Sequence, residues 1–248
     1  MSIFLIGHDN FLPLHHVVYI TDTRSNSSRK LSSRKGAERK IIDAAKQKKK
    51  KSLILTDDAY LIVSSITPQG LHKRFKEKGG SPLKGVISIG HGNFVPISKI
   101  VSIQNINSEP IKEFIKQKNL LDLFISSTNG RKTKSIILTS NHYCIASSLK
   151  TITLKNRINQ FSSSSLMVDV GHENYVNRSL IESILDSDTR PVKTLISKSK
   201  ESHHFINLTM GRKTRALLIA ENGLLISSSV LPETIVQKGF EKGGSDEL

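Results

Sequence analysis

Cationic residues recur at a short turn in three places of the sequence, where they could bind phosphate groups. The stretches "NGRKTK" (129–134) and "MGRKTR" (210–215) lead from a glycine turn into an apolar run, and "KKKK" (48–51) precedes a similar run. Cations on alternate residues of an extended segment lie on one face about 6–7 Å apart, close to the spacing of phosphates along a nucleic-acid strand. The cations of these turns are therefore candidates for contacts to phosphate groups.

The overall charge indicates the same chemistry. The 248 residues include 37 Lys and Arg against 21 Asp and Glu, a formal net charge of +16. This excess favours a polyanionic partner, with nucleic acid ahead of an anionic membrane surface. Aromatic residues make up only 5% of the chain and Trp is absent, so platforms on which single-stranded bases could stack are scarce. Double-stranded DNA is therefore the expected partner, and no membrane is expected.

The expected compartment follows from two further features. Cys144 is the single cysteine, so no disulfide can form within the chain, and a reducing compartment is expected. Its place in an apolar run predicts a buried, unreactive thiol. The opening segment lacks the cationic start of a signal peptide, and no apolar run approaches the roughly 18–20 residues of a membrane span. We expect a cytoplasmic protein associated with the nucleoid.

Histidines in a repeated "GH-x-N" motif are the strongest candidates for catalysis or metal binding. They are His8, His91 and His172. Each motif offers only one histidine, and no Cys, His or Asp cluster surrounds it at ligand spacing, so we interpret these residues as packed turn histidines. The asparagines that follow are interpreted as caps of their own backbone. The sequence thus predicts no catalytic residue, metal or cofactor, and no enzymatic activity.

Internal similarity divides the chain into three tandem modules. The stretches "IGHDNFLP", "IGHGNFVP" and "VGHENYVN" begin a unit with offsets of 83 and 81 residues, and "KSLIL", "KSIIL" and "RALLI" keep the same two offsets. Chance similarity seldom preserves spacing at both ends of a unit. The predicted modules are 1–80, 85–162 and 166–242. Their Gly- and Ser-rich links, 79–85 and 162–165, predict loosely tethered domains.

Periodicity in the second module predicts the order of its elements. "GVISIG" and "SKIVSIQ" are typical of strands on either side of a turn at 93–96. "SEPIKEFIKQK" predicts a helix with Ser108 at the N-cap. A strand, a hairpin about Ser140-Asn141 and a short closing helix complete the unit. Each module is therefore predicted to be a small α+β unit with the order ββαβββα and a mostly antiparallel sheet.

The first module departs from this order in the segment 21–39, "TDTRSNSSRKLSSRKGAER". Only Leu31 is apolar among its helix positions, so we expect no buried face to form. The segment is predicted to be a mobile basic arm.

The combined motifs resemble the RemA family, the extracellular matrix regulatory proteins of bacteria. The similar stretches are "GHGNFVPISKIVSIQNINSEPIKEFI" with "GRKTKSIIL" in module two and "GRKTRALLIAENGLLISSSVLPETIVQ" in module three, with a fainter likeness in module one. The resemblance implies DNA binding by a ring-shaped oligomer. It also implies that the middle cationic turn and a basic residue in an earlier turn contact the phosphate backbone.

The residues implied by this resemblance can be placed one by one. The phosphate-contacting cations of the middle turn correspond to Arg131, Lys132 and Lys134 in module two, to Arg212, Lys213 and Arg215 in module three, and to Lys48, Lys49 and Lys51 in module one, where Gln47 replaces the turn glycine. The basic residue of the earlier turn corresponds to Lys99 and to His16. In module three the same place holds Leu180, a departure from the pattern, although Arg178 stands two residues away. Three fused modules also imply a ring built from multiples of three modules, or an open arc.

Charge is shared unevenly among the modules. The first two carry the positive excess, whereas the third is acidic outside its turn. We therefore expect a non-enzymatic DNA-binding protein, a transcriptional regulator or DNA-architectural factor, whose first two modules supply most of the attraction. Two alternatives remain open: an RNA-binding regulator, and an enzyme acting on nucleic acid or on a phosphorylated ligand.

Overall fold

The structure, a computed structural model, describes residues 3–33, 41–77, 85–162, 165–200, 202 and 204–240. The chain forms two compact units. The first comprises Met1–Ile100, Ile125–Thr133 and Ile145–Leu149, and the second comprises Val101–Phe124, Lys134–Cys144 and Lys150–Leu248. Their division runs through the second module, so the compact units do not coincide with the three sequence modules.

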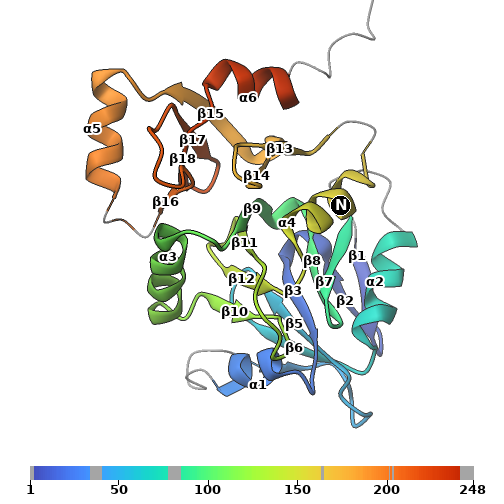
Figure 1. Cartoon of the computed structure of the whole chain (residues 1–248). Coiled ribbons are helices and arrows are strands. Elements are labelled where there is room, and N and C mark those ends of the chain that lie inside the picture. The colour runs from blue at the N-terminus through green and yellow to red at the C-terminus, as the bar shows by residue number, and fades with distance from the viewer. Residues whose placement is uncertain are drawn as a thin grey trace, which may run out of the picture. The chain divides into compact units, whose positions relative to one another are not determined.

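The three modules repeat one order of elements (Figure 1). Module one contains β1 (Ile3–Gly7), β2 (Asn10–Pro13), β3 (Val17–Asp22), α1 (Asn26–Ser33), β4 (Ile41–Asp43), β5 (Ser52–Thr56), β6 (Leu61–Ser64) and α2 (Pro68–Glu77). Module two contains β7 (Val86–Gly90), β8 (Asn93–Pro96), β9 (Ile100–Asn105), α3 (Glu109–Leu120), β10 (Phe124–Ser126), β11 (Ser135–Thr139), β12 (Cys144–Ser147) and α4 (Thr151–Asn159). Module three contains β13 (Met167–Asp169), β14 (Tyr175–Asn177), β15 (Ile181–Asp186), α5 (Arg190–Ser199), β16 (Phe205–Asn207), β17 (Ala216–Ala220), β18 (Leu225–Ser228) and α6 (Pro232–Gly239).

The predicted fold class, three tandem α+β modules, is confirmed, with one strand more than expected in each module. Residues 93–96 were predicted to be a turn but form β8, which pairs antiparallel with β7. A four-residue strand is too short to show alternation of apolar and polar residues, so periodicity could not detect it. Each module is therefore βββαβββα. No helix within the described residues is long and apolar enough to cross a membrane.

In the first unit, strands from two modules form one sheet. Its order is β4-β6-β5-β3-β8-β7, and every pair is antiparallel except β4 with β6. Ile20 of β3 lies opposite Phe94 of β8, and both side chains belong to one buried apolar cluster with Phe4 and Phe75. The prediction of loosely tethered domains is wrong here, because the first hairpin of module two completes the sheet and core of module one.

The second unit repeats this sharing of strands. β14 of module three pairs antiparallel with β9 of module two, and β13 follows β14 at the edge. Module three also has a four-stranded sheet of its own, in the order β15-β17-β18-β16. Val192 of α5, Phe205 and Leu217 form a small apolar cluster that packs this helix on the sheet.

The basic arm predicted at 21–39 is partly helical. α1 spans Asn26–Ser33, so the expectation that no buried face can form is wrong for these residues, while 34–39 lie outside the described residues. Leu31 is buried with only 2% of its surface exposed, and Ser27 and Ser28 are buried beside it. The buried Tyr19 hydroxyl donates a hydrogen bond to Ser27 Oγ at 3.2 Å. Serine hydroxyls with partners thus replace the apolar residues that an amphipathic pattern would require.

Candidate nucleic-acid interface

The middle turns, residues 45–51, 128–134 and 209–215, have the same backbone in all three modules. In each turn a left-handed residue precedes another at the glycine position, as in the pairs Lys46-Gln47 (φ 44° and 62°) and Asn129-Gly130 (φ 51° and 81°). The amide of the next residue closes the turn on a carbonyl three residues earlier, as Arg131 N does on Thr128 O at 3.1 Å. Module one keeps this backbone although a left-handed conformation at a non-glycine residue such as Gln47 costs about 1–2 kcal/mol. Because the backbone is the same, the cations that follow the turn occupy equivalent positions in all three modules.

The cations predicted at the middle turns are exposed in all three modules. Among the described residues, those of modules one and two have no carboxylate within ion-pair distance. In module three, Lys213 Nζ lies 3.0 Å from Asp188. In the turn of module one, Lys50 Nζ lies 3.0 Å from Asp43, whereas the predicted contacts Lys48, Lys49 and Lys51 stay available for an anionic ligand, as do those of module two.

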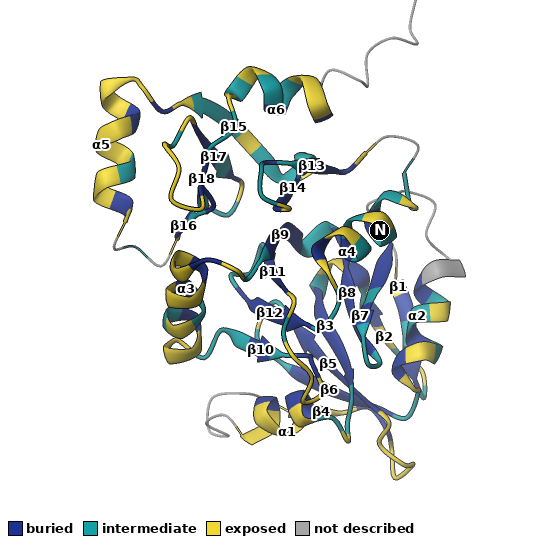
Figure 2. Ribbon diagram, viewed as in Figure 1, coloured by how far each residue is buried: buried dark blue, intermediate teal, exposed yellow. Residues whose placement is uncertain are grey.

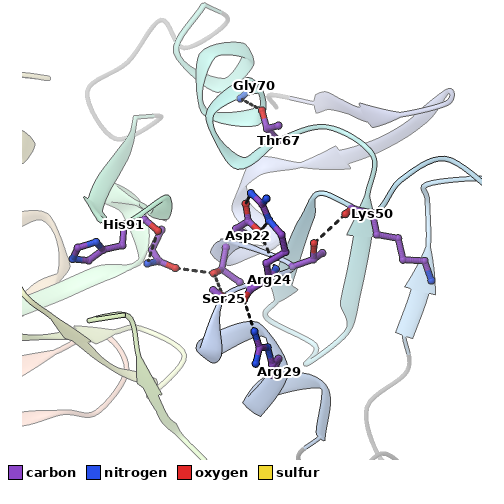
Figure 3. A network of polar contacts seen from close by, with 11 residues as sticks. Asp22, Arg24, Ser25, Arg29, Lys50, Thr67, Gly70 and His91 are labelled. Atoms are coloured by element: carbon purple, nitrogen blue, oxygen red, sulfur yellow. Dashed lines mark hydrogen bonds and ion pairs between the residues drawn. The ribbon is translucent and has the colours of Figure 1, made fainter. Parts of the chain in front are cut away.

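The loop between β3 and α1 is bonded to the middle turn of module one. Thr23 Oγ1 donates to the Lys50 carbonyl at 3.0 Å, and the Thr23 amide donates to the Lys51 carbonyl at 3.2 Å. Figure 3 shows Arg24 in this loop and Arg29 in the helix α1 that follows it. Arg24 forms a bidentate ion pair with Asp22, with both nitrogen-to-oxygen distances 3.0 Å. Arg24 itself stays largely in solvent, since 82% of its side chain is exposed.

The same loop borders a polar cavity of about 690 Å³ in the first unit. Arg24, Arg29 and Lys30 of module one line it, together with Asn129 and Gly130 from the middle turn of module two. The cavity is lined further by Asp22, Ser25, Asn26, Ser27, His91, Asn93, Ser126, Ser127 and Thr128. Three cations against one carboxylate, with many hydroxyl and amide groups, suit a phosphate-bearing ligand.

Arg24, Arg29 and Lys30 were not among the predicted site residues. Their sequence signal was visible, because they belong to the segment interpreted as a basic arm. What the sequence did not show is that α1 holds them beside the middle turn of the next module. Two of the three buried residues of this helix are serines, so the sequence shows no apolar face for it.

Two other predicted contacts have partners within the protein. Lys99 Nζ lies 3.4 Å from Asp57, and only 13% of the Lys99 side chain is exposed. His16 Nδ1 lies 3.0 Å from the other oxygen of the same carboxylate. Arg178 donates to the Gly239 carbonyl near the end of α6 at 2.9 Å. A phosphate would have to displace these partners, so Lys99 and Arg178 are less available than the cations of the middle turns.

His16, Asp57 and Asp58 are the one group within the described residues with metal-ligand spacing, with ligand atoms within 4.8 Å of one another. Burial opposes ionisation of Asp57, but the hydrogen bond from His16 and the charge of Lys99 together hold the pKa of that carboxyl below its ordinary value. Asp57 is therefore ionised at neutral pH. Because Lys99 already places a positive charge on this carboxylate, the group is a poor site for a metal cation.

Two of the three turn histidines and all three turn asparagines have structural partners, whereas His8 Nε2 is buried with no hydrogen-bond partner among the described residues. His91 Nε2 lies 3.0 Å from Ser148 Oγ, and His172 Nε2 lies 3.0 Å from Ser229 Oγ. The predicted backbone caps are confirmed, because the side-chain amides of Asn10, Asn93 and Asn174 donate to the carbonyls of Gly7, Gly90 and Gly171 at 2.8, 2.9 and 2.8 Å. These side chains hold the turn between the first two strands of each module.

Cys144 is buried, as predicted. Burial raises the pKa of its thiol to about 12, against a smaller opposing effect of the charge on Lys118. The thiol is thus protonated at neutral pH and is a poor nucleophile.

Comparison with known proteins gives one family three times along the chain. The sequence model of the RemA-like family, described as extracellular matrix regulatory protein A-like, matches residues 3–75, 86–158 and 167–238. A candidate regulatory protein of Thermosynechococcus vestitus is 36% identical over 72 residues, which cover 29% of this chain and 94% of the relative. Candidate regulatory proteins of a Geobacillus species and of Dictyoglomus thermophilum are 36% and 37% identical over 81 residues, covering 33% of this chain and 90% and 94% of the relatives. Each relative is therefore about the size of one module.

Proposed function

Because this chain belongs to the RemA-like family of regulatory proteins, we propose that it regulates by binding double-stranded DNA, without enzymatic activity. The cations of the middle turns contact the phosphate backbone. The protein acts in the cytoplasm, on the DNA of the nucleoid. The family and the names of the relatives support a regulatory role, whereas the DNA contacts rest on the geometry of the first unit.

The position of the loop between β3 and α1 is the observation on which this proposal rests. On one side it is bonded to Lys50 and Lys51 in the middle turn of module one. On the other side it shares a polar cavity with Asn129 and Gly130 in the middle turn of module two. The middle turns of two modules therefore border one loop, and Arg24 stands in that loop.

This surface favours a polyanion over a small charged ligand. Its cations come from two turns, a loop and a helix, so they extend over more than one phosphate-sized site. Contacts to the sugar-phosphate backbone provide affinity but little discrimination among bases. Linking several weak contacts in one chain raises their effective concentration, so binding becomes tighter without new kinds of contact.

The test is a salt titration of binding to duplex DNA, duplex RNA and single-stranded DNA of equal length. The variant Arg131→Ala/Lys132→Ala removes two exposed cations from the middle turn of module two. If each contacts one phosphate, the slope of log affinity against log salt falls in magnitude by about 1.8 for duplex DNA. Because the contacts are to the backbone, duplexes of different sequence weaken alike.

The control is Lys112→Ala/Lys116→Ala, which removes two exposed cations that form ion pairs on α3. It changes the net charge equally, and its slope stays at the wild-type value. Equal slopes for both variants would contradict the proposed interface. Tighter binding to duplex RNA than to duplex DNA would assign the same surface to RNA.

A further inference from the structure

The chain has two equivalent places at which one module meets the next, and a cavity lies at each. In the first unit, α1 and the loop before it face the end of β10 and the middle turn that follows, across the cavity of about 690 Å³. In the second unit, the equivalent elements α3 and β16 border a cavity of about 210 Å³. The same elements therefore enclose a larger and a smaller cavity, so the difference comes from their residues.

Shorter side chains leave more space at the larger cavity. Phe114 of α3 lines the smaller cavity, whereas its counterpart on α1 is the shorter Leu31, which is buried. Ser127 lines the larger cavity, whereas its counterpart in module three is Leu208, which is completely buried. Protein interiors are close-packed, so a space of this size at one of two equivalent places is a specific feature of module one and its neighbour.

The charges at the two places differ as well. Three exposed cations and one carboxylate line the larger cavity, namely Arg24, Arg29, Lys30 and Asp22. The equivalent residues of module two carry no net charge, namely Asn107, Lys112, Glu113 and Asn105. Figure 2 shows exposed residues along α1, so its cations are open to a ligand from solvent. Space and positive charge thus occur together at one of the two places, as a site for an anion requires.

Two arginines at the larger cavity are oriented by neighbouring groups. Arg24 donates from Nε and Nη2 to the two carboxylate oxygens of Asp22, as Figure 3 shows. The other edge of this guanidinium, formed by Nη1 and Nη2, has no acceptor among the described residues. Arg29 Nη2 donates to the Arg24 carbonyl at 3.3 Å, so the second guanidinium lies beside the same loop. A phosphate group accepts two parallel hydrogen bonds from one edge of a guanidinium, and Arg24 offers such an edge.

The remaining lining suits the hydroxyl groups of a sugar. Hydroxyl and amide side chains dominate it, and no aliphatic side chain, Phe or Tyr is among the described residues that line the cavity. A nucleobase or a lipid chain would find no apolar surface there, whereas a sugar exchanges hydrogen bonds with short polar side chains. The side-chain amides of Asn26 and Asn129 are exposed and make no hydrogen bond with another described residue, so they are available to such hydroxyls.

We propose that the larger cavity binds a free sugar phosphate, which regulates the binding of DNA. The phosphate contacts Arg24, Arg29 and Lys30, and the sugar hydroxyls contact the amides and hydroxyls of the lining. The cavity has the volume of a small-molecule site, about 300–1,000 Å³, so it encloses one such molecule, while a DNA duplex lies only across its mouth. The bound phosphate occupies cations beside the middle turns and lowers DNA affinity. This regulation rests on the proposed function, whereas binding of the sugar phosphate does not.

Isothermal titration calorimetry on the full chain, treated with nuclease, tests the binding at low salt, where exposed charges are least screened. The probes are ribose 5-phosphate and glucose 6-phosphate, with glucose and inorganic phosphate as references. At least one sugar phosphate binds at one site per chain about tenfold more tightly than inorganic phosphate, because its hydroxyls add hydrogen bonds, and glucose does not bind. The proposal is overturned if neither sugar phosphate binds or if inorganic phosphate binds as tightly as both. Adenosine 5′-monophosphate binding about tenfold more tightly than ribose 5-phosphate also overturns it, because the base would then have a binding surface.

Variants at equivalent positions of the two helices locate the site. Arg29→Ala removes a cation from the larger cavity and weakens the sugar phosphate by about tenfold or more. Lys112→Ala removes the equivalent cation from α3 and leaves the affinity unchanged. Thermal melting checks that both variants are folded. If Arg29→Ala melts earlier than wild type, Lys30→Glu, which gives α1 the residue type of Glu113 in α3, takes its place. Equal affinities for the variants of the two helices contradict the site.

Fluorescence anisotropy with labelled duplex DNA tests the regulation. The sugar phosphate that binds in calorimetry, added at about ten times its Kd, lowers the DNA affinity of wild type and of Lys112→Ala by about three- to tenfold. It leaves the DNA affinity of Arg29→Ala unchanged, and an unchanged affinity of wild type overturns the regulation. A chain that binds DNA but neither sugar phosphate contradicts this inference alone, whereas a chain that binds a sugar phosphate but no DNA contradicts the proposed function and leaves the ligand site standing.

Discussion

Residues Arg24 and Asp188 occupy the same loop position in modules one and three, and they carry opposite charges. The backbone around them is alike: each amide donates to the carboxylate two residues earlier at 2.8 Å. Thr23 and Ser187, the residues before them, donate from the side chain to the Lys50 and Thr214 carbonyls of the middle turn at 3.0 and 2.7 Å. The frame that joins loop to turn is therefore the same in both modules, and only the charge that it presents differs.

The loop therefore places a cation beside the middle turn in module one and a carboxylate in module three. Arg24 adds a cation to the cavity of about 690 Å³ in the first unit. Asp188 lies 3.0 Å from Lys213 and 3.3 Å from Lys193 beside a smaller cavity of about 250 Å³. Hydrogen bonds from Lys213 and Lys193 hold the pKa of Asp188 below its ordinary value. The ion pairs are thus present at neutral pH and are lost only as the solution is acidified through this lowered pKa.

Removing the helix anchor of module one should have the largest effect. Leu31→Ala deletes the buried leucine of α1 and costs about 2–5 kcal/mol of stability. Arg29 and Lys30 then lose the helix that holds them beside the cavity, so DNA affinity falls as well. Urea denaturation and a binding titration measure the two effects. Leu195→Ala, a more exposed leucine on α5 of module three, should change stability by no more than about 0.5 kcal/mol; similar losses in both variants would contradict the role of α1.

Replacing Arg24 of module one with aspartate, the residue type at the equivalent position of module three, should have the next largest effect. Arg24→Asp changes the charge of the loop by two units beside the middle turn, and we expect DNA affinity to fall about tenfold at low salt. The loss should shrink as salt is raised, because exposed charges are then screened. Fluorescence anisotropy with labelled duplex DNA measures it. Lys116→Asp, the same charge change on α3, should have a clearly smaller effect, and equal losses would mean that only net charge matters.

Neutralising the carboxylate of module three should have the smallest effect, in the opposite direction. Asp188→Asn removes the acceptor from Lys213 and Lys193, so the turn of module three becomes more available. Exposed ion pairs are weak, and DNA affinity should therefore rise by only about two- to fivefold. Glu221→Gln, the same charge change elsewhere in module three, serves as the control in the same assay. Unchanged affinity for Asp188→Asn would show that this turn takes no part in binding.

Several features could be predicted from residue order because they depend on local chemistry. The three repeats and the turn at Asn129-Gly130 follow from spacing and from the backbone freedom of glycine. The helix begins after Ser108 as predicted, but the Ser108 side chain makes no capping hydrogen bond, so the apolar spacing and not the cap accounts for this prediction. The helical part of the predicted arm did not follow. Leu31 is its one apolar anchor, and its buried serines are satisfied by groups such as the Tyr19 hydroxyl, which lies in another element.

The availability of predicted cations likewise depends on distant groups. Lys99 and Arg178 have the charge expected of phosphate contacts, but Asp57 and the Gly239 carbonyl hold them. Asp57 lies 42 residues from Lys99, and Gly239 lies 61 residues from Arg178. No local pattern joins such pairs.

Residue order alone therefore set the module count, the α+β composition and the position of the cationic turns, since each depends on neighbours a few residues apart. Folding in three dimensions decided that modules share sheets, that α1 stands beside the turn of the next module, and that Phe11 is exposed whereas its counterparts Phe94 and Tyr175 are buried. The physical reason is that strand pairing and ion pairing join residues far apart along the chain, and each pair exists only after the backbone has brought its two members together.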